Sequence, residues 1–119
     1  MQIIIVGCGK VGSTIAEQLS AEGHDITIVD TDESVVQALA TRLDIMGVTG
    51  NGATHSILAE AGVEESDLLI AVTESDELNL LCCMVGKKAG AEHTIARVRN
   101  PEYSQDIGFM KKELGLAMT

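Results

Sequence analysis

Apolar runs alternate with amphipathic stretches along the whole chain. Residues 3–6 form a continuous apolar run, which predicts a buried strand, and apolar side chains recur at helical spacing over residues 10–22. A second apolar run at residues 26–29 predicts another strand, which ends at an acidic residue, Asp30. The chain therefore opens with a strand, a helix and a second strand.

The same alternation continues to the end of the chain. Further strands are expected at three apolar runs: residues 45–48, 68–72 and 94–98. Further helices are expected at four amphipathic stretches: residues 32–43, 54–61, 76–89 and 101–114. Residues 117–119 fall where the repeat requires a sixth strand, so we expect residues 1–119 to be one domain, a fragment of a longer chain.

Apolar strands that alternate with helices are typical of a parallel sheet covered on both faces, because each crossover places a helix on a face. We therefore predict an α/β, Rossmann-like doubly wound parallel sheet with strand order 3-2-1-4-5, a place for a sixth strand, and helices on both faces. In such folds, ligands bind at the carboxyl ends of the strands, near the point where the strand order reverses.

The helix expected over residues 76–89 carries apolar side chains at helical spacing. We expect five of them to be buried: Leu78, Leu81, Cys82, Val85 and Ala89. The segment that precedes this helix, Thr73 to Asp76, fits the capping-box pattern, in which a threonine and an acidic residue three positions later cap the helix.

A glycine-rich turn links the first strand to the first helix, with Gly7, Gly9 and Gly12 in the spacing G-x-G-x-x-G. The first glycine allows a tight turn, the second lets a pyrophosphate approach the backbone, and the third lets the helix pack closely on the strand. The amide groups at the helix start add a partial positive charge. Because a strand precedes the turn and Asp30 follows about 20 residues later, the pattern indicates a dinucleotide site.

Asp30 allows two interpretations. As a ligand-binding residue, it would accept hydrogen bonds from ribose hydroxyls and repel a 2′-phosphate, which favours NAD over NADP. As a structural residue, it would cap the next helix in competition with Asp32. The fingerprint recognises an adenosine, its ribose and a pyrophosphate, so we expect NAD or NADH, with ADP or ATP as the alternative.

Three further loops end at the same edge of the predicted sheet. The turn after the third strand contains Asn51 and Gly52. Thr73 and Glu74 follow the fourth strand, where they would flank the adenosine, although Thr73 would serve equally well as a helix cap. Arg97 ends the fifth strand, where its guanidinium would reach phosphate oxygens or pair with a neighbouring acid.

Composition limits the possible classes of function. A formal net charge of −10 argues against nucleic acid as a partner, because phosphates require clustered lysine and arginine. No apolar run approaches the length of a membrane span, and the start lacks the features of a signal peptide, so we expect a cytoplasmic location. The three cysteines have neither metal-ligand spacing nor an even count, which favours free thiols and no metal site.

The chain offers no set of catalytic residues. A dehydrogenase requires an acid or base beside the nicotinamide and groups that hold a substrate. Of the three histidines, only His55 is expected near the ligand edge, and no hydrolase, zinc-protease or P-loop motif occurs. We therefore expect a binding module and no enzyme. The alternative is the cofactor domain of an NAD-dependent dehydrogenase without its substrate domain.

Five segments together resemble the N-terminal nucleotide-binding domain of potassium-transport regulators, called the TrkA-like or RCK-N (KTN) domain. They are IIIVGCGKVG, DITIVDTD, VTGNGATHSILAEAG, LLIAVTESDELNLL and IARVRNPEY, and they span nearly the whole chain. The resemblance implies a cytoplasmic regulator, peripheral to the inner face of the cell membrane, that binds NAD(H) or another adenine nucleotide. It also implies a homo-oligomer, a dimer or tetramer, that docks on a membrane potassium channel or transporter without inserting into the membrane.

The resemblance places the phosphate loop at residues 7–11, the ribose carboxylate at Asp30, the adenine edge at residues 73–74 and a phosphate-facing arginine at Arg97. Many relatives have an acid after the glycine that follows the third strand, whereas this chain has Asn51, so no acidic contact is expected there. The family's C-terminal ligand domain lies outside this sequence. The residues expected to contact the nucleotide, from the fingerprint, the edge loops and the resemblance together, are Gly7, Cys8, Gly9, Lys10, Val11, Gly12, Asp30, Thr31, Asn51, Gly52, Thr73, Glu74 and Arg97.

Overall fold

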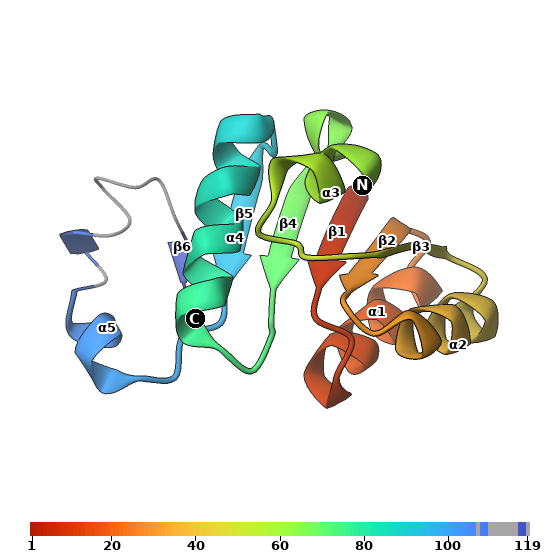
Figure 1. Ribbon diagram of the computed structural model, residues 1–119, viewed down its shortest axis with the longest axis horizontal. Coiled ribbons are helices and arrows are strands. Elements are labelled where there is room, and N and C mark those ends of the chain that lie inside the picture. The colour runs from red at the N-terminus through yellow and green to blue at the C-terminus, as the bar shows by residue number, and fades with distance from the viewer. Residues whose placement is uncertain (107, 110–116, 119) are drawn as a thin grey trace.

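The computed structural model of the chain describes residues 1–106, 108–109 and 117–118, and it shows one sheet with helices on both faces (Figure 1). All strand pairs in the sheet are parallel, and their order is β3-β2-β1-β4-β5-β6. The strands are β1 (Gln2–Val6), β2 (Asp25–Asp30), β3 (Met46–Thr49), β4 (Leu68–Ala71), β5 (His93–Ala96) and β6 (Ala117–Met118). The predicted strand order is confirmed, and the sixth strand lies beside the fifth.

Two helices cover each face of the sheet. α1 and α2 pack on β1, β2 and β3, whereas α3 and α4 lie on the opposite face, where α4 packs on β4 and β5 (Figure 1). A 3-10 helix, η1, leads into β4, and a short helix, α5, follows β5. The helices are α1 (Lys10–Ala21), α2 (Glu33–Leu43), α3 (His55–Glu60), η1 (Val63–Glu65), α4 (Asp76–Ala89) and α5 (Pro101–Gln105).

Strand β1 supplies side chains to both layers of the core. Successive side chains of a strand point to opposite faces. Ile3 and Ile5 accordingly pack with the residues under α1 and α2, while Ile4 and Val6 pack with those under α3 and α4. All four are nearly or fully buried. A central strand that is covered twice has no position for a polar residue, which explains the uninterrupted apolar run.

The prediction that Leu81 is buried is wrong, because this side chain is 48% exposed. The buried face of α4 runs through Asn79, Leu80, the pair Cys82 and Cys83, and Gly86. This face is rotated from the predicted stripe, so Leu81 lies on the solvent side. The rotation also buries Asn79, a polar residue for which the apolar spacing gave no role.

The predicted capping box is also wrong. The N-cap of α4 is Ser75, whose side chain accepts a hydrogen bond from the backbone N–H of Leu78 at 3.1 Å. The hydroxyl of Thr73 instead donates to the side chain of Asn79 at 2.7 Å. The last helix, predicted over residues 101–114, is observed as α5 over Pro101–Gln105, and residues 107 and 110–114 lie outside the described residues.

Candidate functional site

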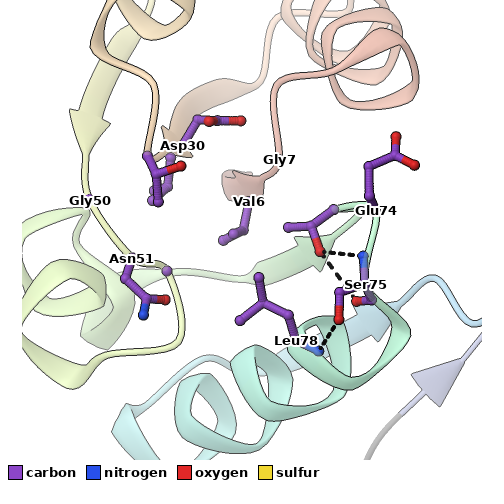
Figure 2. A pocket seen from close by; sticks show the side chains of 12 residues that line it. Val6, Gly7, Asp30, Gly50, Asn51, Glu74, Ser75 and Leu78 are labelled. Atoms are coloured by element: carbon purple, nitrogen blue, oxygen red, sulfur yellow. Dashed lines mark hydrogen bonds between the residues drawn. The ribbon is translucent and has the colours of Figure 1, made fainter.

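A hollow of about 260 Å³ lies at the carboxyl ends of the strands, beside β1 and β4, where the strand order reverses (Figure 2). In this fold, that is the expected place for a ligand. The hollow is lined by Val6, Gly7, Val29, Asp30, Thr31, Gly50, Asn51, Gly52, Thr73, Glu74, Ser75 and Leu78. Seven residues predicted from the sequence are therefore brought together here: Gly7, Asp30, Thr31, Asn51, Gly52, Thr73 and Glu74.

The glycine turn forms one wall of the hollow. Gly7 has φ +105°, a conformation that side chains rarely adopt, and a Cβ at this position would lie 2.9 Å from the backbone nitrogen of Thr73. A Cβ on Gly12 would lie 1.7 Å from the carbonyl oxygen of Gly7, because α1 packs directly on the turn. The tight turn and the close helix packing predicted for these two glycines are both present.

Gly9 differs from the other two glycines of the turn. It is exposed, and a Cβ built on it would meet no atom within 4 Å. It is also the N-cap of α1, and among the described residues no side chain caps this helix and no acidic residue occupies its first turn. The free N–H groups of a helix start carry a partial positive charge. The open space at Gly9 therefore adjoins a helix start that is suited to an anionic group.

Four residues of the predicted phosphate loop do not line the hollow: Cys8, Gly9, Lys10 and Val11. Lys10 and Val11 are exposed at the start of α1. Cys8 is buried, and burial together with the negative charge of Asp30 raises the pKa of its thiol to about 12. The thiol is therefore neutral at pH 7, and Cys8 contributes its backbone N–H to the turn.

Asp30 ties the glycine turn to the end of β2. One carboxylate oxygen accepts a hydrogen bond from the N–H of Cys8 at 2.8 Å, and the other accepts one from the N–H of Asp32 at 3.0 Å. Each oxygen keeps a further lone pair, so the carboxylate can still accept hydrogen bonds from ligand hydroxyls. The helix cap that was considered for Asp30 is provided by Asp32, which accepts from the N–H groups of Ser34 and Val35.

The loop between β3 and α3 forms a second side of the hollow. The side chain of Asn51 accepts a hydrogen bond from the N–H of Ala53 at 2.9 Å, which closes a turn. Gly52 is buried against Val6, with no room for a Cβ, and its carbonyl accepts a hydrogen bond from the Cys82 thiol at 3.1 Å. The loop is therefore held close to both β1 and α4.

The loop between β4 and α4 forms the wall that faces the glycine turn (Figure 2). The Thr73 N–H donates to Oδ1 of Asn79 at 2.8 Å, and Nδ2 of Asn79 donates to the Thr73 carbonyl at 3.2 Å. Asn79 is fully buried. Sequence reasoning missed this residue, and the only signal was a single amide among the apolar positions of α4.

Arg97 lies behind this loop and does not line the hollow. Its guanidinium donates to the Thr73 carbonyl at 2.8 Å, while Nε is buried without a hydrogen-bond partner in the described part of the chain. Of the two interpretations of Arg97, pairing with an acid is not seen within the described ranges. Arg99 makes such a contact instead, with its Nη2 3.5 Å from a Glu74 oxygen.

His55 is not part of this hollow. It is the exposed first residue of α3 and lines a separate hollow with Leu81, Met84 and other residues of α4. Within the described ranges, no group of three or more histidine, cysteine or acidic side chains is placed to hold a metal ion. No helix in these ranges combines the length and the apolar character needed to cross a membrane.

The doubly wound sheet, the glycine turn at its switch point and the carboxylate at the end of β2 place the protein among Rossmann-like domains. Comparison with protein families is more specific, because the TrkA-N domain family matches residues 3–113. The chain belongs to the TrkA-N domain family.

A relative from Halomonas elongata, the Trk system potassium uptake protein TrkA, is 46% identical over 114 residues. The match covers 95% of this chain and 25% of that protein. A homologue from Archaeoglobus fulgidus, the Trk system potassium uptake protein TrkA homolog, is 44% identical over 87% of this chain and 23% of its own length. The chain therefore spans about a quarter of the length of these relatives.

Solved structures show the same fold at lower identity. The TrkA-N domain of inner membrane protein ybaL from Escherichia coli has a TM-score of 0.84 at 23% identity and covers 98% of this chain and 84% of that chain. The GsuK channel bound to NAD has a TM-score of 0.81 at 20% identity, over 99% and 21% of the two chains. The Shewanella denitrificans Kef CTD in its AMP-bound form has a TM-score of 0.78 at 21% identity, over 100% and 70%.

Proposed function

We propose that this chain is the nucleotide-binding regulatory domain of a potassium transport system and that its hollow binds NAD or NADH. The observation that carries the proposal is the open space at Gly9, next to an uncapped helix start and directly after Cys8, whose N–H donates to the carboxylate of Asp30. This arrangement provides for a pyrophosphate and a ribose together. Membership of the TrkA-N family and the names of the relatives support the link to potassium transport.

In the proposed complex, each wall has a separate role. The pyrophosphate lies over Gly9 and the start of α1, and the ribose hydroxyls donate to Asp30. Thr73 and Glu74 flank the adenine, opposite the loop that contains Asn51. The hollow is large enough for part of a dinucleotide, and Val6 and Leu78 supply an apolar floor for the adenine ring.

Arg97 has a supporting role in this proposal. Its guanidinium already bonds the Thr73 carbonyl, so it reaches the phosphates only through the part of its side chain that this contact leaves free. Backbone groups near the phosphates and the ribose would come from four further residues: Cys8, Lys10, Val11 and Thr31.

The nucleotide itself is the part of the proposal with a defined alternative. NAD, AMP, ADP and ATP share the adenosine that the hollow would hold, and relatives in fold have been solved with NAD and with AMP. Asp30 favours a free ribose 2′-hydroxyl over a 2′-phosphate, because the like charges repel. We therefore expect NAD or NADH to bind more tightly than NADP, and ADP or ATP is the alternative class.

The proposed regulation is not catalysis. Nucleotide exchange would alter the loops at the carboxyl edge of the sheet, shift the arrangement of paired domains and so change the activity of a membrane potassium channel or transporter subunit. The domain would act at the inner face of the cell membrane, as a homo-oligomer and together with a C-terminal regulatory domain of the full-length protein. Light scattering of the full-length protein tests self-association, and a monomeric mass would contradict it.

Calorimetric titration with NAD, NADH, NADP, ADP and ATP tests the proposed binding. Asp30→Ala is expected to lose at least tenfold in affinity for the preferred nucleotide. The ribose loses its hydrogen-bond acceptor, and the glycine turn loses the hydrogen bond from the Cys8 N–H to Asp30. Asp25→Ala is the matched control, since Asp25 is an exposed acid at the opposite end of β2. Equal affinity of the wild type and Asp30→Ala for every nucleotide would contradict the proposed site.

Transport in cells tests the regulatory part. Potassium uptake that responds to the nucleotide in the wild type is expected to lose this response in Gly9→Ala and in Asp30→Ala, while Asp25→Ala keeps it. Unchanged regulation in both site variants would overturn the proposed role even if the nucleotide binds.

A further inference from the structure

Asn79 is a buried amide whose full hydrogen-bonding capacity is used. Its Oδ1 accepts from the N–H of Thr73 at 2.8 Å and from the hydroxyl of Thr73 at 2.7 Å. Its Nδ2 donates to the carbonyl of Thr73 at 3.2 Å and to the carbonyl of Arg97 at 2.9 Å. An asparagine side chain has two donor hydrogens and two acceptor lone pairs, so all four are satisfied.

These bonds continue the sheet beyond the ends of its strands. β4 ends at Ala71 and β5 at Ala96, and the last backbone bond between them runs from Arg97 N–H to the Ala71 carbonyl. In the described part of the chain, the segments that follow β4 and β5 share no further backbone-to-backbone hydrogen bond. Asn79 bridges them, because it bonds the N–H and carbonyl groups of Thr73 and the carbonyl of Arg97. The side chain thus replaces a strand partner for the pocket loop.

The position of Thr73 affects both walls of the hollow. Thr73 lines the hollow itself, and its backbone nitrogen lies where a Cβ on Gly7 would come within 2.9 Å. A shift of the Thr73 peptide would therefore either open the adenine side or press on the glycine turn. Either shift would break the hydrogen bonds that hold the Thr73 peptide to Asn79.

We propose that Asn79 is a positioning residue of the nucleotide pocket, which holds the Thr73 peptide against the glycine turn and joins it to Arg97, the residue that follows β5. This inference deepens the proposed function and rests on it for the identity of the ligand. Asn79 does not line the hollow, so its effect on binding is exerted through Thr73.

Two variants of Asn79 separate its roles. Asn79→Leu keeps a similar volume and removes all four bonds, so the peptide of Thr73 loses its fixed position. Asn79→Asp keeps an acceptor for the Thr73 N–H but places a carboxylate oxygen against the carbonyls of Thr73 and Arg97, which repel it. A protonated carboxyl donates one hydrogen bond, so the affinity of Asn79→Asp should recover in part as the pH is lowered.

The control has to lose stability without touching the pocket. Val63 is the fully buried first residue of η1, which lies at the opposite end of β4, and Val63→Ala removes two methyl groups from the core. Calorimetric titration of NAD and ADP into the full chain is expected to give at least tenfold weaker binding for Asn79→Leu. Val63→Ala should bind both nucleotides within twofold of the wild type, even if its melting temperature falls as much as that of Asn79→Leu.

Binding of both nucleotides within twofold of the wild type by a folded Asn79→Leu would overturn the proposal. Equal loss of affinity in Val63→Ala would also overturn it, because the effect would then reflect general stability.

Hydrogen exchange keeps the inference testable without a ligand. If the wild type binds no adenine nucleotide, the proposed function fails, but the Thr73 amide still reports on its bond to Asn79. Exchange at this amide is expected to be at least tenfold faster in Asn79→Leu, with the amides of β1 unchanged and Val63→Ala like the wild type. Unchanged exchange at Thr73 in Asn79→Leu would overturn the positioning role.

Discussion

The two main walls of the hollow are held in place by different means. The wall formed by the β1–α1 turn depends on glycine backbones that pack where side chains would clash, at Gly7 and Gly12. The wall formed by the β4–α4 loop depends on side chains, since Asn79 and Arg97 hold the backbone of Thr73. The first wall is built within a few consecutive residues, while the second is assembled from three separate elements.

This difference predicts different responses to mutation. Replacement of Gly7 or Gly12 should be poorly tolerated, because the atoms nearest to an added Cβ are backbone atoms, which cannot move aside as a side chain can. In a wall held by several side-chain hydrogen bonds, a substitution that removes a single bond costs a smaller amount. The following variants test this contrast, from the largest expected effect to the smallest.

Gly12→Ala is expected to have the largest effect on stability. Its new Cβ would lie 1.7 Å from the Gly7 carbonyl oxygen, so α1 must move away from the turn. We expect a loss of about 3 kcal/mol or more in the free energy of unfolding, measured by urea denaturation. Gly86→Ala is the matched control within α4, because its Cβ would meet only the flexible end of Leu69 at 3.0 Å. A Gly12→Ala variant as stable as this control would contradict the close packing.

Asp76→Asn tests the far side of the β4–α4 wall. The Asp76 carboxylate accepts hydrogen bonds from the backbone N–H groups of Arg99 and Asn100, at 3.0 and 2.7 Å. The bond from Arg99 is the main cause that lowers the pKa of Asp76 below its ordinary value of 3.8. The wild type should therefore be more stable than Asp76→Asn at pH 7, with a loss smaller than that of Gly12→Ala.

The pH dependence of this difference follows from the direction of the shift. A carboxyl whose pKa is lowered by folding adds stability above its unfolded pKa, and this stability is lost as the pH falls through the folded pKa. Thermal unfolding of both proteins between pH 7 and pH 2 should show the difference shrinking below about pH 4. Asp25→Asn should differ little from the wild type at any pH. A constant gap for Asp76→Asn across this range would contradict the role of its charge.

Ser75→Ala removes the cap of α4 and leaves the rest of the wall in place. The N–H of Leu78 loses its acceptor, and we expect a loss of about 1 kcal/mol in the free energy of unfolding. Ser56→Ala, on the exposed side of α3, should cost less because Ser56 lies within its helix. Chemical denaturation of both variants makes the comparison, and equal stability would show that the Ser75 cap adds nothing.

Gly9→Ala should change stability least and binding most. Its Cβ meets no atom within 4 Å and its φ of −73° suits any residue, so we expect a loss below about 1 kcal/mol. The methyl group would nevertheless occupy the approach to the start of α1. We therefore expect at least tenfold weaker binding of the preferred nucleotide in calorimetry, with a nearly unchanged melting temperature. A variant that binds normally would show that the phosphates do not pass over Gly9.

Much of the fold could be predicted because it depends on local patterns. Apolar runs and helical spacing indicate the strands and helices, and their alternation restricts the sheet to a few topologies. The prediction failed where two patterns were both possible. Leu81 and Leu80 are adjacent apolar residues of α4, and only the packing of the helix on β4 and β5 decides that Leu80 is buried and Leu81 exposed.

The capping error has a similar cause. Thr73 and Ser75 both have side chains able to cap a helix, and both precede α4. The Thr73 hydroxyl instead donates to Asn79 and accepts from the N–H of Ser75, and the cap of α4 is Ser75, two residues after the predicted cap. The amide that decides this lies one helical turn further along the chain, and no local pattern indicates that it points inward.

The sequence by itself determined the glycine turn and the acid at the end of β2, because each depends on residues close together in the chain and on the steric limits of glycine. It also determined the sheet order, because the alternation of strands and helices leaves few topologies. Only the tertiary structure decided how the opposite wall is held. Thr73, Asn79 and Arg97 come from β4–α4, α4 and the end of β5, and their hydrogen bonds exist only once the two strands and the helix have packed. Contacts between distant segments depend on how the helices pack on the sheet. The spacing of apolar residues does not fix the rotation of a helix about its axis to within a fraction of a turn.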